Sequence, residues 1–120
     1  PNEINAVWNA LKNLFPYEKK CVIFQPHLYS RTRDFMNEFA KALSQFNRVI
    51  LLPIYPAREL PIEGIESSVL QRKIKSKNVV ELVTKKKLLS VINNSPEKIK
   101  VILGAGDIGM EIEQIKKKLN

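Results

Sequence analysis

Residues 25–34 hold the densest group of side chains that could do chemistry. His27, the only histidine of the chain, is followed closely by Arg31 and Arg33. A guanidinium offers parallel N–H donors that match a carboxylate or a phosphate, and an imidazole can bond a ligand oxygen or change its charge near neutral pH. These residue types, at the start of an expected helix, predict an anion-binding site.

The same segment also allows a purely structural interpretation. Ser30 or Thr32 could cap the helix that follows, and Asp34 could pair with Arg31 or with the helix dipole. His27 could be a hydrogen-bonded turn residue. The residues alone are compatible with both interpretations.

A second loop, residues 55–66, follows another apolar run and is broken by prolines and a glycine. It opens on Tyr55 and then carries Arg58 and Glu59, one charge of each sign. A free α-amino acid presents an ammonium and a carboxylate, which these two side chains could bind. A surface salt bridge between Arg58 and Glu59 is the alternative.

The third loop, residues 104–109, fits the pattern G-x-G-x-x-G between an expected strand and an expected helix. A dinucleotide site also needs an acidic residue on a further strand about 20 residues later, and the 120-residue sequence stops short of that point. We therefore do not expect an NAD site. Gly104 and Gly106 still predict a tight turn that can approach a phosphate or a carboxylate, and Asp107 could simply cap the helix.

Each of these loops follows an apolar run that predicts a buried strand, at residues 21–24, 49–52 and 101–103, with a weaker strand at 79–83. Apolar residues at helical spacing or capping residues predict helices at 2–14, 32–46, 67–77, 84–92 and 108–119, with Ser67 or Ser68 as the cap of the third and Thr84 as the cap of the fourth. This alternation predicts an α/β fold, a Rossmann-like three-layer domain with a mainly parallel sheet flanked by helices. Since such sheets bind ligands beyond the carboxyl ends of their strands, we expect the three loops to share one rim.

Composition narrows the possible partners. The net charge of +8 owes much to lysine runs at 85–87 and 116–118, which lie in expected helices and predict solvated faces. Aromatic residues do not interleave with them, so we expect no nucleic acid partner. No apolar run approaches the roughly 20 residues that cross a bilayer, so we expect no membrane partner. Cys21, the only cysteine, is expected to be buried in a protein of the reducing cytoplasm.

Taken in order, the three loops resemble three signatures of the Mur ligases, most closely of the branch that adds L-alanine. Each motif is weak alone, but together they span nearly the whole chain. Pro1-Asn2-Glu3-Ile4 also resembles the end of the family's histidine-rich hinge motif. The matching residues are Phe24-Gln25-Pro26-His27, Tyr29-Ser30-Arg31-Thr32-Arg33-Asp34, Tyr55-Pro56-Ala57 with Glu59 and Pro61-Ile62, and Gly104-Ala105-Gly106-Asp107-Ile108-Gly109.

This resemblance implies a three-domain cytoplasmic ligase of peptidoglycan synthesis, with residues 1–120 as its carboxy-terminal domain and residues 1–4 as the end of the hinge from a central ATPase domain. In the family, ATP and Mg²⁺ activate the carboxylate of UDP-N-acetylmuramate as an acyl phosphate, which the amine of L-alanine then attacks. This chain has no G-x-x-x-x-G-K-[ST] phosphate loop. ATP and Mg²⁺ would therefore be bound mainly by the central domain, and the fragment alone is expected to be inactive.

The resemblance also implies which residues face the substrate, with Arg31 as the best candidate for a carboxylate contact. Two departures from the family would redistribute the anion contacts: Leu28 stands where many members have an arginine, and Arg58 stands where glycine is common. The residues expected at the site are His27, Arg31, Arg33, Tyr55, Glu59, Gly104, Gly106 and Asp107.

Two other functions fit part of the pattern. A sister ligase that reattaches recycled murein tripeptide to the same sugar nucleotide shares the architecture, although Gln25-Pro26-His27 favours the alanine-adding enzyme. A stand-alone module that binds a nucleotide or a phosphate is suggested by the glycine loop and the positive charge. An ATPase domain encoded directly upstream would exclude the stand-alone module.

Overall fold

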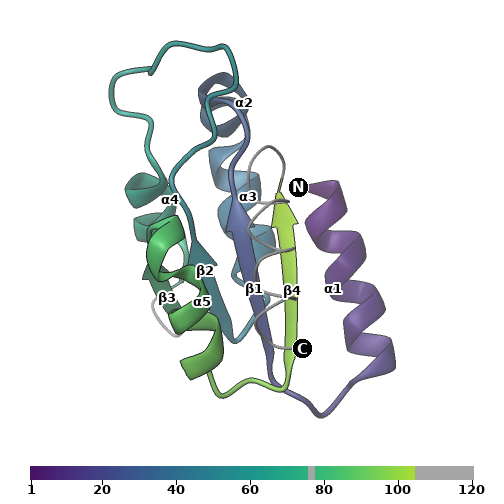
Figure 1. The fold of residues 1–120 in the computed structure, drawn as a ribbon. Helices are drawn as coiled ribbons and strands as arrows, with labels where there is room; N and C mark the ends of the chain where they lie inside the picture. Colours follow the sequence, from purple (N-terminus) through teal and green to yellow (C-terminus); the bar gives the residue numbers. More distant parts are fainter. Residues whose placement is uncertain (76–77, 105–120) are drawn as a thin grey trace.

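The computed structural model describes residues 1–75 and 78–104 of the 120-residue chain (Figure 1). The helix expected at 108–119 and most of the glycine loop, including Gly106 and Asp107, lie outside the described residues. In chain order the elements are α1 (Asn2–Leu14), β1 (Lys20–Gln25), α2 (Tyr29–Asp34), α3 (Met36–Leu43), β2 (Arg48–Leu51), α4 (Ser67–Lys73), β3 (Val79–Leu82), α5 (Lys85–Asn94) and β4 (Ile99–Gly104).

The four described strands form one sheet in the order β3-β2-β1-β4. All three strand pairings are parallel, with Val22 of β1 lying opposite Val49 of β2 and Val101 of β4. The expectation of an α/β fold with a mainly parallel sheet is confirmed. Because the strands run in one direction, β1, β2 and β4 all end at the same edge of the sheet, where the three loops begin.

Alternate residues of the central strands enter two separate cores. Val22 and Phe24 pack on the side of α1, α3 and α4, whereas Cys21 and Ile23 pack on the side of α5. Figure 1 shows α5 over one face of the sheet and α3 and α4 over the other, which gives the three layers. Cys21 is fully buried, as expected. Full burial of a valine or isoleucine side chain such as Val22 or Ile23 contributes about 1.5–3 kcal/mol.

The first helix, α1, forms over the residues that its apolar spacing predicted. Its Trp8 ring packs edge-on against Phe46, with centroids 5.0 Å apart. Lys20 Nζ donates to the Phe15 and Glu18 carbonyl oxygens at 2.6 and 2.7 Å, beside the end of the helix. These contacts fix α1 against the domain. Its first residue then lies beside the carboxyl end of β4 (Figure 1).

The single helix expected at residues 32–46 is wrong. The chain instead forms α2 and α3, separated by Phe35, whose φ of −118° and ψ of 21° are not helical. Apolar residues keep helical spacing across this bend, so periodicity could not reveal it. As a result α2 lies beyond the carboxyl ends of the strands (Figure 1), where the first loop was expected to act.

The capping expectations for α2 are also wrong. Neither Ser30 nor Thr32 caps the helix, because the N-cap position belongs to Leu28. The Thr32 hydroxyl instead donates to the Leu28 carbonyl oxygen at 2.8 Å. Leu28 has a φ of 70°, in the region that favours glycine.

The later helices depart from expectation in smaller ways. Ser67 does not cap α4 but donates to the Leu52 carbonyl oxygen at 2.6 Å. This helix ends at Lys73 rather than near residue 77, because Ile74 turns extended and enters the core. Thr84 does hold the N-cap position of α5, although its side chain makes no capping bond. The lysines at 85–87 are exposed on α5, as expected of a solvated face.

Candidate functional site

The first and second loops are joined directly. His27 and Tyr55 form an isolated parallel bridge, and their rings stack with centroids 5.7 Å apart. The Leu28 N–H donates to the Tyr55 carbonyl oxygen, and the Tyr55 N–H donates to the Pro26 carbonyl oxygen, both at 2.8 Å. The expectation that these two loops share one rim is confirmed.

The third loop begins beside the first. Gly104, the last residue of β4, lies opposite Gln25, the last residue of β1. Its φ is +150°, and a Cβ at this position would lie 3.0 Å from the Gln25 carbonyl oxygen. Only glycine adopts this conformation at such close approach without strain. Gly104 therefore brings the start of the third loop to the same rim.

Glu59 binds the start of α2. Its Oε1 accepts the Ser30 N–H at 3.0 Å, and its Oε2 accepts the Ser30 hydroxyl. The hydroxyl bond, followed by the backbone bond, lowers the pKa of the Glu59 carboxyl below its ordinary value. The alternative of an Arg58–Glu59 salt bridge is not observed among the ion pairs of residues 1–75 and 78–104.

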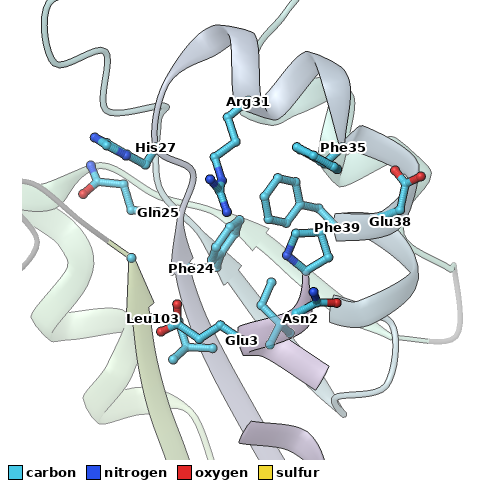
Figure 2. A pocket seen from close by; sticks show the side chains of 13 residues that line it. Asn2, Glu3, Phe24, Gln25, His27, Arg31, Phe35, Glu38, Phe39 and Leu103 are labelled. Carbon is cyan, nitrogen blue, oxygen red and sulfur yellow. The ribbon is translucent and has the colours of Figure 1, made fainter. Parts of the chain in front are cut away.

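A cavity of about 420 Å³ lies where α1, α2 and α3 meet the ends of β1 and β4. Phe24, Phe39 and Leu103 give it an apolar wall, while Arg31 is its cation. Figure 2 shows the Arg31 side chain extending from α2 toward Phe24. The lining residues are Pro1, Asn2, Glu3, Ile4, Phe24, Gln25, His27, Arg31, Phe35, Glu38, Phe39, Leu103 and Gly104.

The Arg31 guanidinium lies 5.9 Å from the centre of the Phe35 ring, a cation–π distance. An exposed guanidinium at the wall of an apolar cavity can bind a carboxylate or a phosphate through two parallel hydrogen bonds.

The expected site residues that the structure describes fall into three groups. His27, Arg31 and Gly104 line the cavity, whereas Tyr55 and Glu59 contact the first loop without lining the cavity. Arg33 does not line the cavity either, and it pairs with Asp34 at 2.9 Å. The possible ion pair between Asp34 and Arg31 is therefore wrong, because Asp34 pairs with Arg33.

Several cavity residues escaped prediction. Glu3 and Glu38 bring carboxylates to the wall from α1 and α3; Glu3 was noted only as part of the hinge motif, and no motif marked Glu38. Phe24 stood in the first quoted motif and in an expected strand, and Phe39 lay in an expected helix, but neither was assigned to the site. The position of Phe24, the last apolar residue of β1, at the carboxyl end of a central strand was a further signal.

Residues 1–75 and 78–104 hold no group of three or more His, Cys, Asp or Glu side chains that could ligate a metal ion. Over the same residues, no helix has the length and apolar character needed to cross a membrane.

Comparison with known proteins identifies relatives over the whole chain, although no family model matches it. It is 53% identical over 120 residues to the UDP-N-acetylmuramate–L-alanine ligase of Flavobacterium psychrophilum, and 51% identical over 119 residues to that of Christiangramia forsetii. The matches cover 27% and 26% of those two proteins. The chain thus spans about a quarter of the length of the curated relatives that it matches.

A solved structure agrees. The UDP-N-acetylmuramate–alanine ligase MurC of Thermotoga maritima superimposes with a TM-score of 0.74 at 26% identity, over 99% of this chain and 24% of that one. Sequence and fold therefore point to the same proteins. Over its full length the chain is homologous to the UDP-N-acetylmuramate–L-alanine ligases, and it corresponds to about one quarter of their length.

Proposed function

We propose that this chain is the carboxy-terminal domain of an ATP-dependent ligase that joins L-alanine to UDP-N-acetylmuramate in cytoplasmic peptidoglycan synthesis. In this role the domain binds the amino acid and closes the catalytic cleft. The observation that carries the proposal is the convergence of His27, Tyr55 and Gly104 around a rim where Arg31 enters an apolar cavity. The similarity to alanine-adding ligases over the whole chain supports it.

Within this proposal Arg31 binds the carboxylate of the amino acid, because it is the one guanidinium among the residues that line the cavity. His27 lines the same rim and can bond a ligand oxygen. The Gly104 turn allows close backbone approach nearby, whereas Arg33, paired with Asp34, lies outside the cavity lining. The domain thus contributes positioning and charge stabilisation rather than a covalent nucleophile.

ATP and Mg²⁺ would be bound mainly by other parts of the ligase. Two observations support this division: the sequence lacks a phosphate loop, and residues 1–75 and 78–104 hold no metal-binding group. UDP-N-acetylmuramate would likewise reach the cleft from another domain. Residues 1–4 would form the end of the hinge from the central ATPase domain, at the point where α1 begins with Asn2.

A chimaera tests the proposal. The matching segment of the Flavobacterium psychrophilum ligase is replaced by this chain, and ADP release is measured with UDP-N-acetylmuramate and either L-alanine or murein tripeptide. We expect L-alanine to be preferred at least ~10-fold in kcat/KM. ADP release with the tripeptide tests the alternative that the domain belongs to the recycling ligase.

The junction control is a second chimaera that carries the corresponding segment of the Christiangramia forsetii ligase, which is 51% identical to this chain. An active control beside an inactive test chimaera would overturn the proposal, and the stand-alone module would then be the better interpretation. A preference for tripeptide would assign the domain to the recycling ligase.

A further inference from the structure

Glu59 was expected at the substrate, but the structure gives its carboxylate a different set of partners. Both carboxylate oxygens accept hydrogen bonds from Ser30, one from the N–H and one from the hydroxyl. Glu59 is not among the residues that line the cavity, whereas Arg31, the residue after Ser30, is. The carboxylate therefore acts on the first turn of α2.

We propose that Glu59 is a positioning residue that holds the start of α2 so that Arg31 enters the cavity, and that Glu59 itself does not touch the substrate. The inference rests on the proposed function for the identity of the ligand. It reassigns Glu59 from direct amino acid binding to the support of Arg31.

The need for such support follows from the length of α2. A helix of six residues is marginal alone, and its first N–H groups have no partner within the helix. No side chain at its N-cap satisfies them, because that position is Leu28. The Glu59 carboxylate, brought from the second loop, accepts the Ser30 N–H instead. Its negative charge also suits the positive end of the helix dipole.

The backbone before α2 also needs to be held. Leu28 has a φ of 70°, a conformation that costs a non-glycine residue free energy and persists only where its surroundings impose it. Its N–H donates to Tyr55, and its carbonyl oxygen accepts both the N–H and the hydroxyl of Thr32. The second loop thus holds the first at two places, through Tyr55 before the helix and through Glu59 at its first turn.

The turn that carries Glu59 is itself defined. The Glu59 N–H donates to the Pro56 carbonyl oxygen at 2.9 Å, and Ala57 has a φ of 52°. This closed turn fixes the backbone from which the carboxylate reaches Ser30. Glu63, further along the same loop, is exposed and forms no ion pair among the described residues, so it serves as a matched control.

Kinetics of the full-length ligase test the inference. We expect Glu59→Ala to raise the KM for L-alanine about tenfold and leave the KM for ATP unchanged, with partial rescue in Glu59→Gln. Glu63→Ala should match the wild type. In an Arg31→Ala background, Glu59→Ala should add less than about a twofold effect, because both changes disable the same contact.

The contrary results are distinct. A full tenfold loss added on top of Arg31→Ala would mean that Glu59 binds the substrate itself. If Glu59→Ala and Glu63→Ala have the same KM for L-alanine, Glu59 has no role in positioning Arg31.

Hydrogen exchange gives a second test that needs no activity. Glu59→Ala should speed exchange of the Ser30 and Thr32 amides while β1 stays protected. Unchanged exchange would overturn the support of α2. If the wild-type protein shows no L-alanine-dependent ADP release, the proposed function is wrong. The hydrogen-exchange result would still decide whether Glu59 supports α2.

Discussion

The rings of His27 and Tyr55 stack with 18° between their planes, and their backbones form a parallel bridge. The two residues come from loops that follow β1 and β2, so the contact closes the space between two strand ends. With Gly104 opposite Gln25, three distant stretches of sequence meet at one edge of the sheet. His27 and Gly104 of this edge line the cavity that Arg31 enters.

The first prediction concerns Gly104, which lies opposite Gln25 at the end of β4. Gly104→Ala should destabilise the chain by about 2 kcal/mol or more, because φ would be strained and the new Cβ would lie against the Gln25 carbonyl oxygen. Gly64→Ala is the control: φ there is +80° but nothing lies within 4 Å, so the cost should be about 1 kcal/mol. Urea unfolding of both variants measures the difference. Equal costs would show that the close approach to Gln25 does not matter.

A second prediction concerns the buried thiol. Burial raises the pKa of Cys21 to about 12, above the ordinary value of 9.0. The folded protein therefore holds this proton more tightly than the unfolded chain. The contribution to stability is complete below about pH 9 and is lost as the pH rises toward 12. Unfolding free energies measured at increasing alkaline pH should fall less steeply in Cys21→Ala than in the wild type.

The same burial makes the thiol unreactive. A thiol-specific disulfide reagent should modify native Cys21 at least ~100-fold more slowly than the urea-unfolded chain. Rapid modification of the native protein, or identical alkaline slopes for wild type and Cys21→Ala, would contradict the buried, protonated state.

A third prediction concerns the charged group near Cys21. Arg48 donates to Glu97 at 2.8 Å and also to Glu81. Burial alone would lower the pKa of Arg48, but these two hydrogen bonds outweigh it and raise the pKa. Arg48→Ala would leave Glu97, with 6% of its side chain exposed, without this partner. We expect a loss of about 3 kcal/mol in the free energy of unfolding.

The matched control for Arg48 is a pair of the same chemistry on the surface. Arg33 and Asp34 are 51% and 54% exposed, so Arg33→Ala should change stability by less than about 0.5 kcal/mol. Thermal unfolding of both variants separates the two cases. Similar effects would mean that burial of the Arg48 pair adds nothing.

Much of this fold could be predicted because its strands are apolar on both faces. Runs such as 49–52 are recognisable without any contact information, since a sheet covered on both sides requires them. α1 was equally plain from its apolar spacing. The break at Phe35 was not, because the apolar spacing of α2 and α3 continues through it and only the backbone angles change.

The site could be predicted only as a set of loops. That His27 and Tyr55 would meet followed from parallel strands ending at one edge, but the partner of Glu59 did not. The bonds from Ser30 to Glu59 depend on the turn at Ala57 and on the positive φ of Leu28, and neither residue type indicates such a backbone. The roles of Gly106 and Asp107 stay predictions, because both lie outside the described residues.

The most direct test of the account is the activity of Arg31→Ala in the full-length ligase. Arg72→Ala, an exposed change in α4 away from the cavity lining, is the control. With circular dichroism confirming that both variants are folded, Arg31→Ala should lower L-alanine-dependent ADP release at least ~10-fold at a fixed alanine concentration, while Arg72→Ala should match the wild type. Unchanged kinetics in Arg31→Ala would contradict the placement of the amino acid at this rim.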